Sequence, residues 1–141
     1  MTISWNGTPI SNITVGLTTL CNAACPQCAR TIGKGLYDLE SMTFEGFKKA
    51  FPPAILADLL YIGFCGSLGE PTLCHDCLEI VQYTRQCNPD IHIAIATNGS
   101  TRDEHWLSRS ASTPSSNRSP IPIWLLNSFV SATKPRTIPS V

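Results

Sequence analysis

Residues 18–28 read Thr-Thr-Leu-Cys-Asn-Ala-Ala-Cys-Pro-Gln-Cys, so a short apolar run leads directly into a loop with three cysteines. These are Cys21, Cys25 and Cys28, at positions i, i+4 and i+7. Thiolates are soft ligands that favour iron–sulfur clusters, zinc or copper(I), and a loop this short can direct three sulfurs toward one point. Three thiolates are one too few for a closed four-iron site, so one iron would stay open to an exchangeable ligand. The stretch therefore predicts a metal or cluster site at the end of a strand.

The chain around this loop alternates strand and helix patterns. Three apolar runs, at residues 13–20, 59–64 and 91–96, are short enough to be strands, and the first is rich in β-branched residues. Between them, Thr43 can cap a helix that ends before two prolines, and Asp76 can cap a second helix. The order strand, helix, strand, helix, strand is typical of right-handed βαβ units, and it predicts an α/β fold with a parallel sheet.

Each predicted strand is followed by an unusual loop. The loops are Cys21–Cys28, Gly66–Glu70 and Asn98–Ser100. In parallel sheets and barrels the loops at the carboxyl ends of the strands open on one face, and sites are built there. We therefore expect these distant segments to meet.

The cysteine spacing resembles a known family. CxxxCxxC behind a first strand is similar to the motif of the radical S-adenosylmethionine (radical SAM) enzymes, and Cys21, Cys25 and Cys28 match it. The resemblance implies a [4Fe-4S] cluster on these cysteines, with S-adenosyl-L-methionine bound to the fourth iron. It further implies reductive cleavage to a 5′-deoxyadenosyl radical, hydrogen abstraction from a substrate, and an electron donor such as a flavodoxin or ferredoxin. It identifies neither the substrate nor a catalytic residue.

Two further positions resemble the same family. Gly69 and Glu70 look like its glycine–glutamate motif, which receives the ammonium group of S-adenosylmethionine, and Asn98 resembles the end of the third strand in many members. The resemblance covers about residues 11–106 and implies the N-terminal part of a partial (β/α) barrel of TIM-like type. Only about three βα units are found here, whereas the family's partial barrel needs about six, by analogy with the eight units of a full barrel. We therefore expect weak S-adenosylmethionine binding and little turnover.

A zinc module is the alternative that the cysteines leave open. Cys25 and Cys28 form one CxxC pair, and Cys74 and Cys77 form a second. The stretch between the pairs is far longer than the roughly 15–20 residues of an ordinary zinc ribbon. Bound zinc without sulfide would favour this non-catalytic reading.

Composition bounds the compartment and the partners. The chain has seven cysteines and no basic-then-apolar N-terminal signal, which favours a reducing, cytoplasmic location over a disulfide framework. No apolar run approaches the roughly 20 residues that span a bilayer, so no membrane role is indicated. With 10 basic and 10 acidic residues and no basic block, no nucleic-acid partner is evident either.

The sequence changes character near Trp106. Residues 1–106 contain all 10 acidic residues and all 9 glycines, whereas residues 107–141 contain none and are rich in serine and proline. We interpret residues 1–106 as the N-terminal part of a radical SAM core. We interpret residues 107–141 as an irregular, low-complexity or disordered tail. A frame-shifted or truncated end of a longer gene is our hypothesis for this tail, and a natural regulatory tail is the alternative. A sheet that stopped after the third strand would expose an edge prone to self-association.

Overall fold

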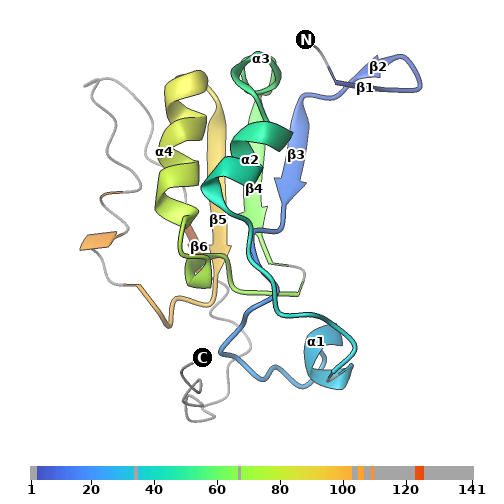
Figure 1. The fold of residues 1–141 in the computed structure, drawn as a ribbon, viewed down its shortest axis with the longest axis vertical. Coiled ribbons are helices and arrows are strands. Elements are labelled where there is room, and N and C mark those ends of the chain that lie inside the picture. The colour runs from blue at the N-terminus through green and yellow to red at the C-terminus, as the bar shows by residue number, and fades with distance from the viewer. Residues whose placement is uncertain are drawn as a thin grey trace.

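The computed structural model describes residues 3–33, 35–66, 68–102, 105–106, 109 and 123–125 of the chain. Two short strands precede a sheet that alternates with helices (Figure 1). The elements in chain order are β1 (Ser4–Trp5), β2 (Thr8–Pro9), β3 (Asn12–Val15), α1 (Ala29–Ile32), α2 (Phe44–Ala50), α3 (Pro53–Leu56), β4 (Tyr61–Cys65), the 3-10 helix η1 (Pro71–Leu73), α4 (Cys77–Cys87), β5 (His92–Thr97) and β6 (Ile123–Leu125).

The main sheet has four parallel strands in the spatial order β3-β4-β5-β6. The central strand β4 pairs with both neighbours, because Tyr61 is in register with Asn12 on one side and with His92 on the other. The parallel pairing of β3, β4 and β5 confirms the predicted parallel sheet, and the helices between them confirm the α/β order. The partial barrel of TIM-like type stays a prediction.

The strand β6 corrects our expectation that the sheet stops after its third strand and leaves an open edge. It pairs with β5 through the register Ile95↔Ile123, Ala96↔Trp124 and Thr97↔Leu125. The serine and proline content of residues 107–141 hid a short apolar run at 121–126. Its proline at position 122 immediately precedes the strand, where a missing N–H is tolerated. The prediction of low complexity or disorder otherwise falls outside the described residues, apart from Arg109.

The first strand of the sheet is shorter than the predicted run 13–20. After Val15 the backbone leaves β4 and pairs with residues 40–42 instead. The N–H of Met42 donates to Leu17 O at 2.7 Å, and the N–H of Thr19 donates to Glu40 O at 2.9 Å. The cysteine loop therefore starts from a short antiparallel pairing beyond the strand end.

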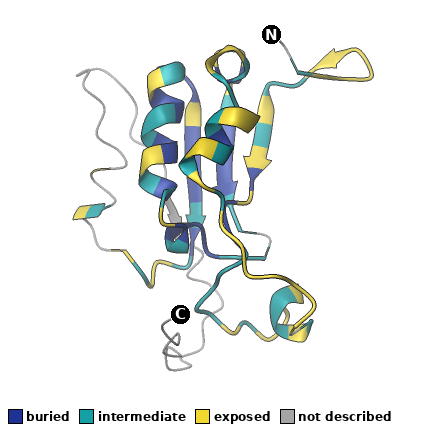
Figure 2. Ribbon diagram, viewed as in Figure 1, coloured by how far each residue is buried: buried dark blue, intermediate teal, exposed yellow. Residues whose placement is uncertain are grey.

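The helices α2, α3 and α4 lie on one face of the sheet and bury the core against it (Figure 1). Burial is concentrated in β4, β5 and the sides of the helices that face them (Figure 2). For α2, the spacing of Phe44, Phe47 and Phe51 predicts one apolar, packed face. This prediction is confirmed, because Phe47 is fully buried and its ring centroid lies 6.1 Å from that of Phe64 in β4. Alternation along β4 places Ile62 and Phe64 in this core, as expected for a strand covered by helices.

One of the two predicted helix caps is confirmed, and the other is confirmed in its position but not in its side-chain hydrogen bond. The side chain of Thr43 accepts a hydrogen bond from Gly46 N at 3.1 Å at the start of α2. Asp76 precedes α4 but makes no side-chain cap there. Its Oδ2 instead accepts from Phe44 N at 2.8 Å, and so it ties the start of α4 to the start of α2.

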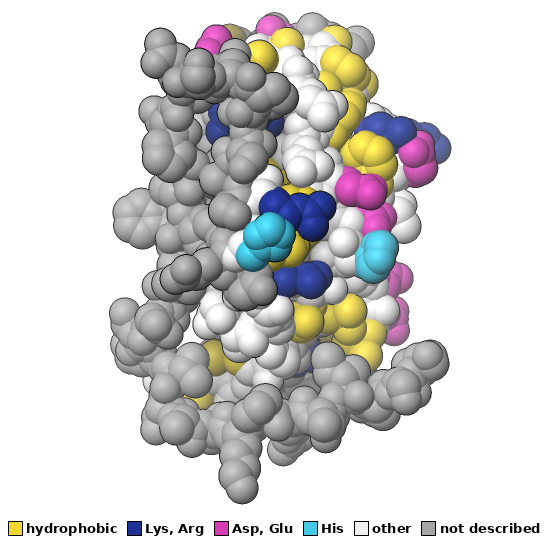
Figure 3. Space-filling view, turned by 90° about the vertical axis from the view of Figure 1, so that its left-hand side faces the viewer, with side chains coloured by type: hydrophobic (Ala, Val, Ile, Leu, Met, Phe, Trp, Pro, Cys, Tyr) yellow, Lys and Arg dark blue, Asp and Glu magenta, His cyan; other side chains and the backbone are white. Residues whose placement is uncertain are grey.

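The surface that Figure 3 presents carries basic, acidic and hydrophobic side chains close together, without an extended patch of one kind among its described residues. No helix in the described part of the chain is long and apolar enough to cross a membrane. The segment around α1 is the most exposed apolar region, and Ile32 and Leu36 are 73% and 79% exposed. This segment follows the cysteine loop directly.

Candidate functional site

The cysteine loop lies beyond the carboxyl end of β3. Cys21, Cys25 and Cys28 are free thiols of intermediate burial. The N–H of Cys28 donates to Cys25 O at 3.1 Å, so the second and third cysteines share a turn, and Cys28 then begins α1 as its N-cap residue. Arg30 returns from α1 and donates from Nε to Thr19 O at 3.0 Å. The three predicted ligands thus lie on one loop whose two ends are tied together.

Residues 68–70 pack directly onto the start of this loop. The N–H of Glu70 donates to Leu20 O at 2.6 Å. A side chain at Gly69 would overlap the backbone carbonyl of Thr18 and approach Leu20 O to 2.9 Å. Glycine is therefore required at position 69 for the backbones to meet.

The carboxylate of Glu70 joins this segment to the end of β5. Glu70 is only 3% exposed. Its Oε1 accepts from Thr72 N at 3.2 Å and from the hydroxyls of Thr72 and Thr97, and its Oε2 accepts from Asn98 N at 2.7 Å. Four neutral donors compensate the buried charge, as a buried carboxylate requires.

The turn after β5 completes the site. Asn98 Nδ2 donates to Asn22 Oδ1 at 3.0 Å, and Asn22 Nδ2 donates to Ser100 Oγ at 2.7 Å. Ser100 Oγ donates in turn to Asn98 Oδ1 at 2.6 Å. Gly99 has φ +69°, a left-handed conformation that allows Ser100 to turn back to Asn98. Asn22 lies between the first two cysteines, so this turn holds the cysteine loop.

The predicted convergence of the three loops is confirmed, and we call residues 21–28, 68–70 and 97–100 the strand-end site. The predicted residues Gly69, Glu70 and Asn98 all lie in it. Sequence reasoning missed Asn22, whose partners are 76 and 78 residues away. The position of Asn22 inside the cysteine motif pointed to a role in the site, but the neighbouring sequence did not indicate its partners.

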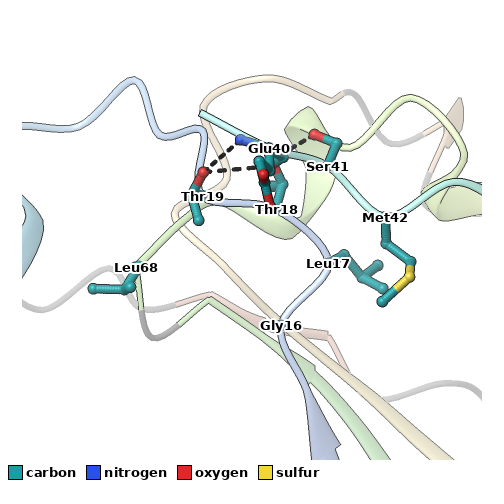
Figure 4. Close-up of a pocket in the computed structure, with 8 residues that line it drawn as sticks. All are labelled: Gly16, Leu17, Thr18, Thr19, Glu40, Ser41, Met42 and Leu68. Atoms are coloured by element: carbon teal, nitrogen blue, oxygen red, sulfur yellow. Dashed lines mark hydrogen bonds between the residues drawn. The ribbon is translucent and has the colours of Figure 1, made fainter. Parts of the chain in front are cut away.

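A cavity of about 350 Å³ adjoins the strand-end site (Figure 4). Residues 16–19, 40–42 and Leu68 line it. The Thr18 and Ser41 hydroxyl oxygens are 2.7 Å apart in its wall, and Thr18 Oγ1 also donates to Glu40 O at 2.8 Å. Its volume is within the roughly 300–1,000 Å³ range of small-molecule sites.

The donor set of the cysteine loop fits an iron–sulfur cluster in its chemistry, since three free thiols share one short loop. Among the described residues, however, no three His, Cys, Asp or Glu side chains are arranged to hold a metal ion. Burial raises the pKa of the Cys21 thiol, partly offset by a hydrogen bond from the Ala23 backbone and by the charge of Arg30. Metal binding would therefore have to deprotonate this thiol and draw the three sulfurs together.

The zinc alternative receives no such support. Cys77 begins α4 and Cys74 lies just before it, and both are fully buried in the core, whereas Cys25 and Cys28 are of intermediate burial. Cys74 Sγ donates to Met42 O at 3.3 Å. Burial raises the pKa of Cys77 to about 12, so zinc binding there would have to deprotonate a fully buried thiol.

Of the comparisons with known proteins, the one with solved structures finds similar chains. No protein-family model matches the sequence, and no curated protein matches it. Among solved structures, the chain is similar to BtrN in complex with AdoMet and 2-DOIA, with 26% identity and a TM-score of 0.61 over 71% of this chain and 40% of BtrN. It is also similar to BtrN in an open conformation, with 26% identity and a TM-score of 0.59 over 71% of this chain and 44% of BtrN. The chain thus spans less than half the length of BtrN. These similarities support a distant relationship to the radical SAM enzymes.

Proposed function

We propose that residues 1–106 belong to the cofactor-binding part of a radical SAM enzyme, which cleaves S-adenosylmethionine reductively and abstracts hydrogen from a substrate. The observation that carries this proposal is the meeting of the cysteine loop, Glu70 and Asn98 at the strand ends of a parallel sheet. BtrN, whose structure the chain resembles, contains AdoMet in one of its crystal structures.

Three cysteines of the strand-end site would hold a [4Fe-4S] cluster, namely Cys21, Cys25 and Cys28. When bound, the cluster supplies the electron that cleaves the sulfonium of S-adenosylmethionine, and a flavodoxin- or ferredoxin-like protein would deliver it. Three thiolates leave one iron free for an exchangeable ligand, which suits this use.

Gly69, Glu70 and Asn98 would contribute to the S-adenosylmethionine site. Glu70 supplies the acidic group, and its Oε2 accepts the Asn98 N–H and has a second lone pair for a cationic amine. Gly69 keeps this carboxylate next to the cysteine loop, because only glycine allows the close backbone approach. Since the chain spans less than half of BtrN, the substrate is outside this proposal.

Anaerobic reconstitution with iron and sulfide tests the proposal. We expect a brown protein with about four iron and four sulfide ions per chain. Cys25→Ala should lose most of them. Cys87→Ala is the matched control, because Cys87 is a free thiol at the far end of α4. Bound zinc without sulfide, or equal loading of the Cys25→Ala variant, would contradict a cluster on this loop.

Binding and turnover of S-adenosylmethionine form a second test. We expect weak binding and little 5′-deoxyadenosine from the 141-residue chain after reduction, since positional errors near 1 Å can cost about a hundredfold in rate. Chromatography of the reduced, reconstituted protein measures the product. Robust 5′-deoxyadenosine formation would show that the chain already contains a working S-adenosylmethionine site.

A further inference from the structure

The side chains of Asn22, Asn98 and Ser100 form a closed ring of hydrogen bonds. Each of the three donates one bond within the ring and accepts one, with donor–acceptor distances of 3.0, 2.7 and 2.6 Å. Such a ring satisfies both ends of each amide, and its bonds can reinforce one another. It links the cysteine loop to the end of β5, two segments that are far apart in the sequence.

Two features of the backbone fix one side of this ring. The N–H of Asn98 is bound to the buried carboxylate of Glu70 at 2.7 Å. The N–H of Ser100 donates to Asn98 Oδ1 at 3.0 Å, and this bond closes the turn around Gly99. Asn98 is therefore held by the core on one side, and its amide reaches the cysteine loop on the other.

We propose that Asn98 is a positioning residue that presets the cysteine loop through Asn22, so that the loop is partly ordered before any cluster is present. The Asn22 amide is the only described side chain between Cys21 and Cys25 that bonds to the turn after β5. Without the Asn22 amide, the residues between Cys21 and the turn at Cys28 would lose their bond to the turn after β5. The relevance to a cluster rests on the proposed function, whereas the ordering of the loop does not.

Amide hydrogen exchange of the metal-free protein tests the ordering by a double-mutant cycle. Asn98→Ala removes two of the three ring bonds and both bonds that hold Ser100 to the Asn98 amide, but it keeps the Asn98 N–H bond to Glu70. Asn22→Ala breaks the link between the loop and the turn from the loop side.

Within residues 23–28 the N–H of Cys28 donates to Cys25 O, and each variant should raise the exchange of this amide by about tenfold, the effect of losing one to two hydrogen bonds. The double variant should exchange little faster than either single variant, because both changes weaken the same link between the cysteine loop and the turn after β5.

Asn12→Ala is the matched control, since Asn12 is exposed at the opposite end of β3. It should leave the exchange of residues 23–28 unchanged, and all four variants should show the same exchange within α4 as the unsubstituted protein. Fully additive effects of the two single substitutions, or unchanged exchange in Asn98→Ala, would overturn the proposal.

The rate at which the reconstituted protein loses its cluster is a second measurement, and it does not depend only on the stability of the whole fold. A chelator should remove iron several-fold faster from reconstituted Asn98→Ala than from reconstituted Asn12→Ala. The loss of visible absorbance measures this rate. If the unsubstituted protein takes up no cluster, the proposed function fails while the exchange cycle still decides the role of Asn98. If the cluster forms and leaves both variants at the same rate, the positioning role fails and the proposed function stands.

Discussion

Replacing Glu70 should destabilise the fold more than its position in a loop suggests. Its buried carboxylate accepts hydrogen bonds from two backbone N–H groups, those of Thr72 and Asn98, and from two threonine hydroxyls. The hydroxyls can turn to other partners, since Thr72 Oγ1 also lies within hydrogen-bond distance of Thr101 Oγ1. The backbone donors cannot turn away. Leaving the buried N–H of Thr72 and the partly buried N–H of Asn98 unsatisfied costs up to about 1–3 kcal/mol each, so we expect Glu70→Ala to lose about 2–6 kcal/mol.

Glu70→Gln separates the acceptor geometry from the charge. The amide oxygen should take the Oε1 position, where three donors converge, which turns the NH₂ group toward Asn98 N. One donor then faces another, and we expect a loss of about 1–3 kcal/mol. Glu45→Gln is the control, because Glu45 is 80% exposed and its ion pair with Lys48 should contribute at most about 0.5 kcal/mol.

Equilibrium urea unfolding of the reduced protein measures these differences, with an unchanged m-value as the check on two-state behaviour. Domains of this size are stable by about 5–15 kcal/mol, so the alanine variant can approach the limit of folding while the glutamine variant stays measurable. A Glu70→Gln variant as stable as Glu45→Gln would refute the reasoning. The carboxylate would then not carry the contacts between the loops.

Two further predictions concern close packing and buried thiols. Gly69→Ala drives a methyl group into the carbonyl of Thr18 and should cost about 1–3 kcal/mol or more in urea unfolding. Gly16→Ala, whose nearest contact would be Cys65 O at 3.8 Å, should stay within about 0.5 kcal/mol, and equal losses would count against the packing argument. The raised pKa of Cys77, about 12 against an ordinary 9.0, makes the unfolded thiol ionise first. Stability from this group is therefore complete below about pH 9 and is lost as pH rises toward 12, by at most about 1.4 kcal/mol per pH unit. Urea midpoints of Cys77→Ala should fall less steeply above pH 9, and identical slopes would contradict this assignment.

Local patterns predicted the parts of the fold that depend on local interactions. Thr43 caps its helix because its partner is three residues away, and Phe47 is buried because helical spacing sets its face. The order of the strands also followed from short apolar runs. The carboxyl-end rule then brought the cysteine loop, Glu70 and Asn98 together without any knowledge of their contacts.

The errors arose where distant partners decide. Asp76 is of a residue type that caps helices and it lies at the start of α4, yet its side chain accepts from Phe44 N, 32 residues away. The strand β6 is three residues long in a serine- and proline-rich stretch, so only its pairing with β5 makes it a strand. Asn22 reads as a loop residue until the turn after β5 is placed beside it.

The spatial order of the four sheet strands repeats their order in the chain. Such a sheet can grow at one edge during synthesis on the ribosome, because no strand has to insert between two others. The outer edge of β5 nevertheless stays unpaired until β6 has been synthesised. With roughly 25 residues between them and a translation rate of about 5–20 residues per second, the wait is about one to five seconds. During that interval neighbouring nascent chains on a polysome can pair with the same edge. The speed of translation between these two strands therefore sets how long each nascent chain is open to mispairing.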